Sequence, residues 1–334
     1  MNVTKDGFKD RQLHIEDYLQ MVSAEQKEYA EVSAHQRIAE NNDIITDFQT
    51  DNLMEQILHR DNLNKAYKKV KSNKGAGGVD GMSVDELLGF LKDNQEQLIQ
   101  QIKDGKYKPN PVRRVEIPKE TKGEFRKLGV PTVVDRVFQQ AITQILTPIY
   151  EKQFSEDSFG FRPNRGAHDA LKQCQTNVND GYVYVVDMDL EKFFDTVCQS
   201  KLIEVLSRTI KDGRVISLIH KYLNAGVISR GMFEKTEVGM PQGGPLSPLL
   251  SNIMLNELDK ELTRRGHRFV RYADDCMIFC KSRKSAERTL NNIVPYIEGK
   301  LFLKVNRTKT CVAHISKVKY LGYSFYRYKG MCRF

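Results

Sequence analysis

Two adjacent acids, Asp274 and Asp275, are the residues whose type and spacing most directly indicate chemistry. They lie in the middle of residues 269–280, between two apolar runs rich in aromatic and β-branched side chains. This pattern predicts a β-hairpin with both acids at its tip. Neighbouring carboxylates repel each other, which is unfavourable for stability. A bound divalent cation reverses this effect, because its charge then dominates the site. A stretch such as residues 272–275, taken alone, is more often only a turn, so other segments must decide whether it is a metal site.

A third acid, Asp189, follows an apolar run at 184–188 that predicts a strand with a polar end. Side chains alternate along a strand, so Asp187 and Asp189 share one face with Val185. Together with the acidic pair, Asp189 would place three carboxylates on neighbouring strands. Such a cluster can hold two Mg²⁺ ions about 3.5–4 Å apart, an arrangement that activates an attacking oxygen and stabilises a leaving one.

The length and composition are those of an ordinary globular protein. A chain of 334 residues can bury a large core and form two or more subdomains. No apolar run approaches the roughly 20 residues of a membrane span, and the N-terminal residues include no apolar signal region. The six cysteines are scattered and include no CxxC pair, which argues against structural zinc and a disulfide framework. We therefore expect a cytoplasmic protein, kept reduced and without a membrane partner.

The positive charge is unevenly distributed. Residues 1–60 contain 6 Lys and Arg against 12 Asp and Glu, whereas the whole chain has a net charge of +9. The remaining residues therefore have a net charge of +15. A surface that basic favours a polyanion such as nucleic acid, although solubility alone would also explain it.

The pattern of apolar residues predicts an α+β fold with a mainly antiparallel sheet. The expected helices lie at 53–70, 84–102, 134–149, 200–210, 215–223, 249–262 and 284–300. Thr132 with Asp135 is expected to begin the third of these helices, and Ser247 is expected to cap the sixth, with Pro248 in its first position. Beyond the strands already named, further strands are expected at 115–119, 125–131, 301–305 and 318–328.

The two strands at 115–119 and 125–131 form a predicted hairpin in the basic stretch 106–136. This hairpin would carry Lys119 and Arg126 outward, where the pair could grip a triphosphate, the arginine with bidentate contacts. A solvated hairpin face explains the same residues equally well.

Seven blocks of the sequence resemble the reverse-transcriptase domain of group II intron-encoded maturases. The resemblance extends over about residues 52–328, and the blocks follow the family's order. They are residues 73–81, 126–132, 158–163, 189–195, 241–252, 272–275 and 320–323. The block 272–275 alone is a weak signal, whereas the ordered set is highly specific. The resemblance implies a right-handed polymerase with fingers and palm, in which a mainly antiparallel palm sheet packs on helices and the fingers carry a helical extension.

The resemblance also implies roles for individual residues. Asp189, Asp274 and Asp275 correspond to the catalytic, metal-binding triad of the palm. The residues that correspond to the dNTP-binding site are Lys119, Arg126, Leu190, Phe194 and Gln242.

Three of the implied roles are more specific. Phe194 corresponds to the aromatic residue beneath the incoming sugar that excludes a 2′-hydroxyl, although a core phenylalanine is the alternative. Tyr323 corresponds to the element that positions the primer end. Lys309 is a candidate acid for the departing pyrophosphate.

The same comparison suggests a division of the chain. Residues 1–51 would form a helical or loosely ordered extension, 52–140 the fingers and 141–197 the first part of the palm. Residues 198–240 would return to the fingers and 241–334 would complete the palm. No residues after Tyr328 remain for a thumb, so we expect the thumb to be absent from this chain.

The function implied is that of an RNA-directed DNA polymerase that also binds intron RNA as a maturase in splicing and retrohoming. The expected cofactor is a pair of Mg²⁺ ions, with Mn²⁺ as an alternative. The expected partners are an RNA template, intron RNA, a DNA primer and dNTPs, and a homodimer is compatible with this function. The expected location is the bacterial cytoplasm.

Two alternatives remain open. The chain could be a splicing cofactor with an idle polymerase, or a reverse transcriptase of another bacterial retroelement, such as a diversity-generating or CRISPR-associated one. One local departure from the family also matters: Cys198 and Gln199 stand where relatives usually have Asn and His, which leaves the role of that pair open.

Overall fold

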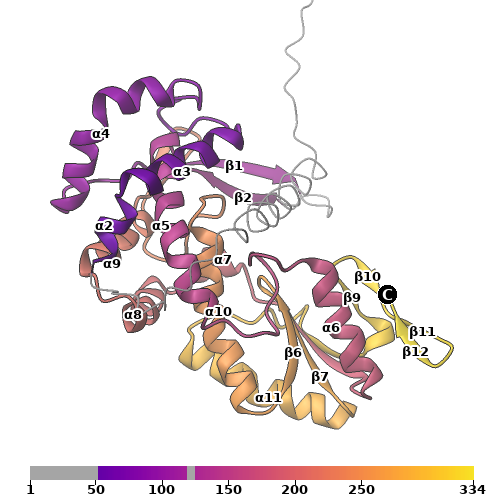
Figure 1. Ribbon diagram of the computed structural model, residues 1–334. Helices are drawn as coiled ribbons and strands as arrows, with labels where there is room; N and C mark the ends of the chain where they lie inside the picture. The colour runs from indigo at the N-terminus through magenta and orange to yellow at the C-terminus, as the bar shows by residue number, and fades with distance from the viewer. Residues whose placement is uncertain (1–51, 119–124) are drawn as a thin grey trace, which may run out of the picture.

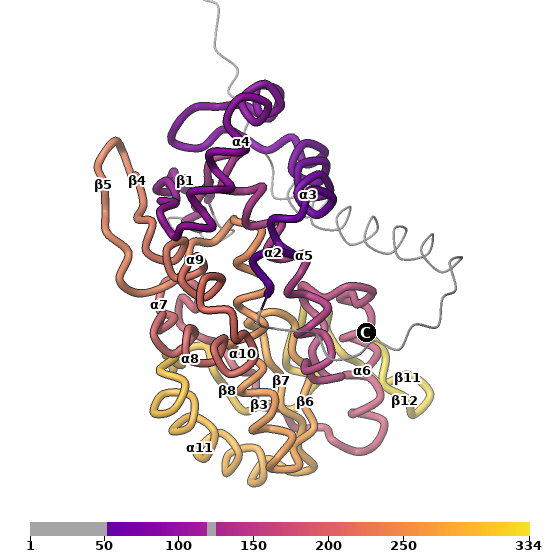
Figure 2. Tube along the Cα trace, turned by 60° about the vertical axis from the view of Figure 1, so that its left-hand side comes forward, coloured from indigo at the N-terminus to yellow at the C-terminus, as the bar shows by residue number. Residues whose placement is uncertain are grey.

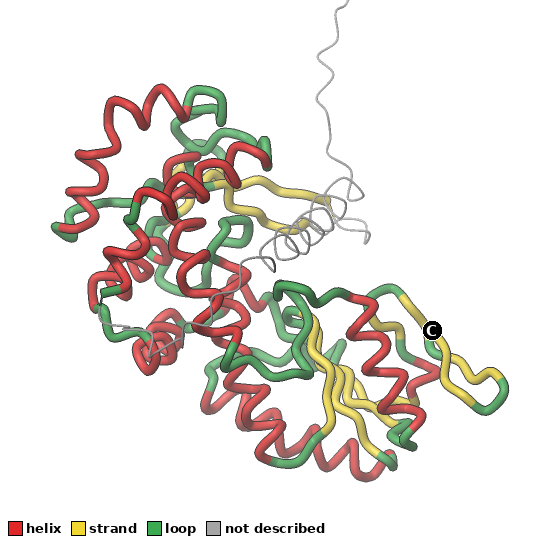
Figure 3. Tube along the Cα trace, in the orientation of Figure 1, coloured by secondary structure: helices red, strands yellow, loops and turns green. Residues whose placement is uncertain are grey.

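The computed structural model describes residues 52–118 and 125–334. One half of the molecule is mainly helical with a small sheet, and the other contains a strand layer with helices on both sides (Figure 3). The α+β class is therefore confirmed. The six cysteines are free, as expected. No helix within the two described ranges is long and apolar enough to cross a membrane.

The helical half is organised around α5, Val133–Glu151, against which α2, Leu53–Ile57, and α3, Arg60–Ser72, pack (Figure 1). Thr132 caps α5 as predicted, because its hydroxyl accepts a hydrogen bond from the Asp135 backbone N–H. The single helix predicted at 53–70 is wrong. His59 adopts an extended conformation and caps α3 by accepting from the Asp61 N–H, so the chain breaks there.

The small sheet of this half has the strand order β2-β1-β4-β5. β1, Val112–Pro118, and β2, Phe125–Val130, form the predicted antiparallel pair. β4, Val227–Ser229, lies parallel to β1 and turns back into β5, Met232–Glu234. The β4–β5 hairpin was not predicted, because three residues per strand are too few to show alternation.

Four more helices complete this half and its junction with the large sheet. They are α4, Leu87–Lys103; α7, Phe193–Thr196; α8, Gln199–Thr209; and α9, Gly213–Leu223. The predicted helix at 84–102 therefore begins three residues later. Ser83 and Glu86 make reciprocal hydrogen bonds in the turn that precedes it.

The large sheet is antiparallel throughout and has the strand order β6-β7-β3-β8 (Figure 2). Its strands are β6, Arg268–Tyr272; β7, Asp275–Cys280; β3, Tyr184–Met188; and β8, Cys311–His314. β8 was not predicted. The strand expected at 301–305 is wrong, because only Val305 makes an isolated bridge, to Leu190.

Helices cover both faces of the large sheet (Figure 1). On one face lies α6, Ala167–Asn179, in a core that includes Leu171, Val185 and Met277. On the other lie α10, Ser247–Arg264, and α11, Arg283–Lys300, in a core that includes Val186 and Ile278. The alternation of buried side chains along β3 and β7 therefore supplies both cores from the same strands.

Two details of the C-terminal third differ from the predictions. Ser247 is the first residue of α10 rather than its cap, and its hydroxyl donates to the Pro241 carbonyl at 2.6 Å. The strand predicted at 318–328 divides into three short strands, β9, Lys319–Tyr320, β10, Tyr323–Ser324, and β11, Tyr326–Tyr328. A further strand, β12, Met331–Arg333, pairs with β11.

Candidate active site

The acidic pair lies at the tip of the β6–β7 hairpin, which confirms the predicted hairpin. Tyr272 at the end of β6 pairs with Asp275 at the start of β7, so Ala273 and Asp274 form the connection. Ala273 has a φ of 55°, a left-handed conformation that is unfavourable for a residue with a Cβ atom. Such a conformation persists only where surrounding contacts determine it.

These contacts come from two segments behind the turn. Gly160 lies so close that a Cβ atom there would be 2.3 Å from the Ala273 backbone nitrogen. Asn252 of α10 donates its side-chain amide to the Gly160 carbonyl at 2.8 Å. Arg271 donates to the Ala273 carbonyl and to the Asn252 side chain, both at 2.9 Å. Helix α10 and the loop before α6 therefore fix the backbone that presents Asp274.

Arg271 is itself held by a buried ion pair with Asp259 of α10. Its guanidinium donates to both carboxylate oxygens, at 2.8 and 2.6 Å, and both side chains are 0% exposed. Asp259 raises the pKa of Arg271 against the opposing effect of burial. Sequence reasoning missed this pair. Its only signal was an arginine at 271 within an otherwise apolar strand.

Asp189 follows the last residue of β3, in the strand next to β7. Met188 pairs with Cys276 at the end of the β3–β7 ladder, so Asp189 continues opposite Asp275. The Thr310 hydroxyl makes two bonds to the Asp189 backbone: it accepts from the N–H at 3.1 Å and donates to the carbonyl at 3.3 Å. Lys309 lies beside this acid, with its Nζ 3.8 Å from the Asp189 Oδ2. The structure thus brings the three predicted triad residues to one end of the sheet.

The acids at this end of the sheet repel one another. Burial raises the pKa of Asp275 to about 7, with further contributions from Asp274, Asp187 and Asp189. Burial also raises the pKa of Asp274, an effect that Arg126 partly offsets. The pKa of Asp187 rises to about 6 through burial and the charge of Asp189. Asp275 lies among these acids yet keeps exposed surface, so a cation can reach its carboxyl.

This donor set fits a divalent metal. Carboxylate oxygens are the ligands that hard cations such as Mg²⁺ prefer, and a cation would relieve the repulsion that raises these pKa values. Within residues 52–118 and 125–334, no three His, Cys, Asp or Glu side chains already have the geometry of a metal site. The three acids are therefore coupled through their charges without converging on one point.

Of the two residues predicted to bind a triphosphate, the structure describes Arg126, in the β1–β2 hairpin. Arg126 lies on β2 with its side chain exposed, and its charge acts on Asp274 across the site. The Arg126 guanidinium is therefore close enough to Asp274 for its charge to oppose the rise in that acid's pKa. Lys119 lies outside the described residues.

The loop before α10 is locked to β2 through its backbone. The Gly129 N–H donates to the Gln242 carbonyl at 2.7 Å. Gly243 has a φ of 123°, and a Cβ atom there would be 2.7 Å from the Gly129 carbonyl oxygen. Glycine at 243 therefore allows this close approach, which sets the distance between Gln242 and Arg126.

The same loop is locked to α7. The Met240 N–H donates to the Phe194 carbonyl at 2.7 Å, and the Gly239 N–H donates to the Val197 carbonyl at 2.8 Å. Gln199 is buried and donates its side-chain amide to the Gly239 carbonyl at 2.9 Å and the Leu223 carbonyl at 3.1 Å. Gln199, whose role the sequence left open, therefore anchors this loop to α9.

Phe193 and Phe194 differ in burial, although Phe194 also packs against the core. Phe193 is 2% exposed and lies in the core, whereas Phe194 is only partly buried. Their rings meet edge to face, with centroids 5.3 Å apart. Leu190 has a buried side chain, so its backbone is the part that could contact a nucleotide.

The β9–β10 hairpin carries Tyr323, the residue predicted to position the primer. Tyr323 is exposed on one side and meets the rings of His168 and Phe334, each at 5.9 Å. Tyr320, its partner across the hairpin, donates its hydroxyl toward the carbonyls of Asp275 and Val270, both at 3.3 Å. Tyr320 was not predicted. It links the hairpin directly to the acidic turn.

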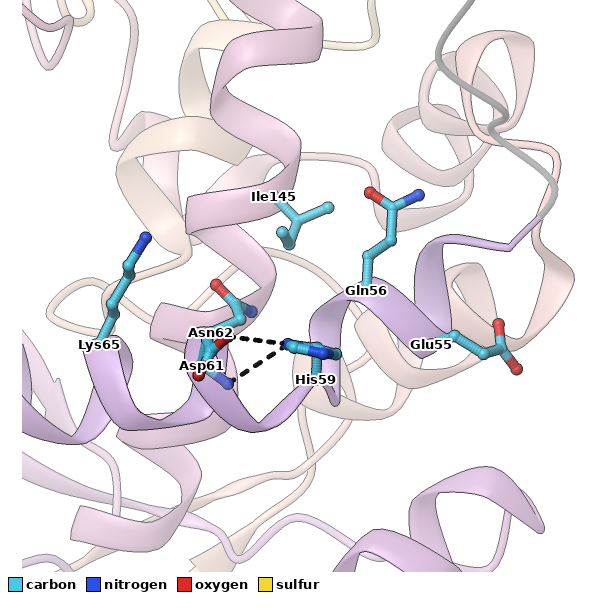
Figure 4. A pocket seen from close by; sticks show the side chains of 7 residues that line it. All are labelled: Glu55, Gln56, His59, Asp61, Asn62, Lys65 and Ile145. Carbon is cyan, nitrogen blue, oxygen red and sulfur yellow. Dashed lines mark hydrogen bonds and ion pairs between the residues drawn. The ribbon is translucent and has the colours of Figure 1, made fainter. Parts of the chain in front are cut away.

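A surface pocket elsewhere in the molecule contains none of these residues (Figure 4). It lies where α2, α3 and α5 meet, and the His59 Nδ1 is 3.7 Å from an Asp61 carboxylate oxygen there. The other side chains that line it are Glu55, Gln56, Asn62, Lys65 and Ile145. Its position among the helices, away from the strand ends, separates it from the acidic site.

Comparisons with known proteins agree with this arrangement. The family model described as reverse transcriptase (RNA-dependent DNA polymerase) matches residues 117–325. The group II intron-encoded protein LtrA of Lactococcus lactis subsp. cremoris is 32% identical over 353 residues, which cover 86% of this chain and 59% of that protein. Protein YkfC of Escherichia coli strain K12 is 34% identical over 304 residues, covering 79% of this chain and 80% of YkfC.

The solved structures support the fold. Telomerase from Candida tropicalis, in complex with a telomeric RNA fragment, matches with a TM-score of 0.51 and 15% identity. The match covers 70% of this chain and 46% of the telomerase chain. The resemblance to group II intron-encoded proteins is confirmed by the relatives, although this chain spans only 59% of the length of LtrA. The chain belongs to the reverse transcriptase (RNA-dependent DNA polymerase) family.

Proposed function

We propose that this chain is the RNA-directed DNA polymerase of a group II intron, adding dNTPs to a primer 3′-hydroxyl on an RNA template. The observation that carries the proposal is the acidic site itself. Asp189, Asp274 and Asp275 lie at the same end of the adjacent strands β3 and β7, and the charge of Arg126 on β2 acts on Asp274. Acids that raise one another's pKa need a cation, and a nucleoside triphosphate needs both that cation and a positive residue opposite it.

In the proposed site, the three acids hold two divalent ions, Mg²⁺ or alternatively Mn²⁺. When bound, these ions lower the pKa of the primer hydroxyl and neutralise the triphosphate and leaving pyrophosphate. Because Asp274 lies at a turn fixed from behind, its carboxylate is positioned before the substrate arrives. Such preorganisation avoids a reorganisation cost during the reaction.

Residues of this chain would orient the substrates. Arg126, with Lys119, binds the triphosphate, and Gln242 lies beside the nucleotide. Phe194 presents its half-buried ring to the sugar, and the backbone bonds of Met240 and Gly129 keep the ring, Gln242 and Arg126 in register.

Two further residues act on the primer end and on the departing pyrophosphate. Tyr323 positions the primer end, held near the acids by the bond from Tyr320 to the Asp275 carbonyl. Lys309 donates a proton to the departing pyrophosphate, a role supported by its 3.8 Å distance from Asp189.

The remaining parts of the proposal concern organisation and partners. We assign residues 52–140 and 198–240 to fingers, and 141–197 and 241–334 to palm. The basic residues after 60 would bind template and intron RNA, which is also the basis for a maturase role. The intron origin of LtrA and the bacterial source of LtrA and YkfC support this role and a bacterial location, and the free cysteines support the cytoplasm.

Primer extension on an RNA template with Mg²⁺ tests the proposal. We expect Asp274→Asn to abolish nucleotide addition while leaving RNA affinity and the unfolding temperature close to wild type. Glu191→Gln, which changes an exposed carboxylate two residues from Asp189, is the matched control and should retain activity. Extension by the Asp274 variant at a few per cent of wild type would overturn the assignment. Absence of extension by the wild-type chain, with RNA binding intact, would favour the splicing cofactor.

A further inference from the structure

The last two strands of the chain form a small ribbon with one covered and one open face. β11 and β12 pair antiparallel, and Lys329 and Gly330 form the connection with φ values of 49° and 82°. Positive φ at both turn residues is typical of the tight hairpin turn whose twist matches its strands. The ribbon projects from the large-sheet half of the molecule beyond α6 in both views (Figures 1 and 2).

The covered face packs on α6. Cys332 is 2% exposed, its N–H donates to the Asn179 side chain at 2.8 Å, and its carbonyl accepts from the Gln175 side chain at 2.6 Å. These two bonds fix the ribbon to a helix that is part of the core around the large sheet. The ribbon is therefore a defined surface rather than a loose tail.

The open face is aromatic. Tyr326 pairs with Arg333 and Tyr328 with Met331, so these four side chains share the face opposite Cys332. Tyr326 and Tyr328 are each 57% exposed and Met331 is 50% exposed. Two tyrosines and a methionine side by side form an apolar surface of the kind that binds a partner.

The charge around this face indicates what the partner is. Residues 299–334 contain nine Lys and Arg residues and no Asp or Glu. Lys329 lies with its Nζ 5.6 Å from the centre of the Tyr328 ring, and Arg333 is exposed on the same face as the tyrosines. Exposed rings beside the cations Lys329 and Arg333 complement a ligand that has both flat apolar faces and negative charge.

We propose that the open face of the β11–β12 ribbon binds unpaired nucleotides of a single-stranded polynucleotide. Tyr326 and Tyr328 stack on bases, while Lys329 and Arg333 contact the phosphates. A duplex does not fit as well, because its bases are stacked on one another and their faces are covered. The inference rests on the proposed function for the class of partner, but it assigns a contact surface separate from the acidic triad.

Binding of a fluorescent, unstructured RNA oligonucleotide by the full chain tests this surface. A DNA oligonucleotide of the same length and an RNA duplex are measured in parallel. Tyr326→Leu with Tyr328→Leu keeps an apolar surface and removes the rings, whereas the double change to Phe keeps the rings. We expect the Leu variant to lose single-strand affinity by at least tenfold, because one stacked base contributes roughly 5- to 150-fold. The Phe variant should bind within about twofold of wild type, since stacking uses the ring face rather than the hydroxyl.

A second measurement does not depend on the Leu variant folding. The chain has no tryptophan, so Tyr328→Trp creates a single fluorescent reporter on the open face. Its emission should be quenched by single-stranded RNA or DNA and much less by the duplex. Equal quenching by RNA and DNA would identify a surface for any single strand, and quenching by RNA alone would identify one for RNA.

Several outcomes would overturn the proposal. Unchanged affinity in the Leu variant, or an equal loss for duplex and single strand, would remove the stacking role. A change in Trp emission with protein concentration alone would indicate that a second copy covers the face. Primer extension distinguishes the two proposals. If the wild type extends primers while the Leu variant binds normally, only the ribbon assignment fails; if the wild type binds but never extends, only the polymerase assignment fails.

Discussion

The buried pair between Arg271 and Asp259 should be essential both for the stability of the large-sheet half and for the position of Asp274. Asp259→Ala removes the anion and leaves a guanidinium without a counter-charge at a position that is 0% exposed. Breaking a buried ion pair in this way typically costs about 3–5 kcal/mol, because the remaining charge is desolvated and unpaired. For a chain of this size, that corresponds to a fall in Tm of roughly 5–10 °C.

Thermal unfolding followed by circular dichroism measures this cost, and primer extension measures the effect on the turn. Arg283 and Glu287 provide the matched control, since they form an ion pair at 2.9 Å with both side chains exposed. Glu287→Ala should cost less than about 1 kcal/mol, because an exposed pair is screened by solvent.

A double variant separates stability from positioning. Arg271→Met with Asp259→Leu replaces the pair by apolar side chains and should recover most of the lost stability. It still lacks the bond from Arg271 to the Ala273 carbonyl, so nucleotide addition should stay low. If Asp259→Ala costs no more than Glu287→Ala, the charge is not truly desolvated and the reasoning fails. Full activity in the double variant would show that the turn does not depend on Arg271.

Three further changes test the site. Phe194→Val should fold and should lower the ratio of kcat/KM for a deoxynucleotide to kcat/KM for the matching ribonucleotide. Phe193→Ala, at a core position, should instead lose about 3–5 kcal/mol of stability. An unchanged ratio in Phe194→Val would show that Phe194 is only a core residue. Burial and neighbouring acids raise the pKa of Asp275 from 3.8 to about 7. Between about pH 4 and about pH 7, the folded state therefore binds more protons than the unfolded state, and without metal the stability of the fold should decrease as the pH rises through this range. Asp275→Asn should flatten that slope in Tm measured against pH, and an identical slope would contradict the assignment. Gly243→Ala would bring a Cβ atom to 2.7 Å from the Gly129 carbonyl oxygen and should raise the KM for dNTP in primer extension; an unchanged KM would show that the loop can shift without consequence.

Local sequence patterns were sufficient for several elements of the fold. Two apolar runs around a polar step predicted the hairpin over 269–280, and the cap formed by Thr132 predicted the start of α5. These features depend on residues within a few positions of each other, so their physical causes can be read from spacing. The order of the family blocks then indicated which acids would meet.

Local patterns failed where a hydrogen bond or strand pairing that the pattern did not include competed with them. Ser247 has the type and position of a helix cap, but its hydroxyl donates to the Pro241 carbonyl instead. The helix predicted through His59 breaks because that side chain accepts from the Asp61 N–H, which begins a new helix. β8, whose four residues are at most partly buried, is defined by its pairing with β3 rather than by its own alternation.

The sequence by itself therefore determined the α+β class, the acidic hairpin and the three candidate acids, because these follow from residue type and short-range periodicity. The other candidate residues of the site came from the resemblance to the family. Only the tertiary structure decided how they are held. The register that sets Asp189 opposite Asp275 joins strands 86 positions apart, and the bond between Gly129 and Gln242 joins segments more than 100 positions apart. No local spacing encodes such partners. They follow from chain packing, which brings Arg271 onto Asp259 and Gly160 beneath the turn that carries Asp274.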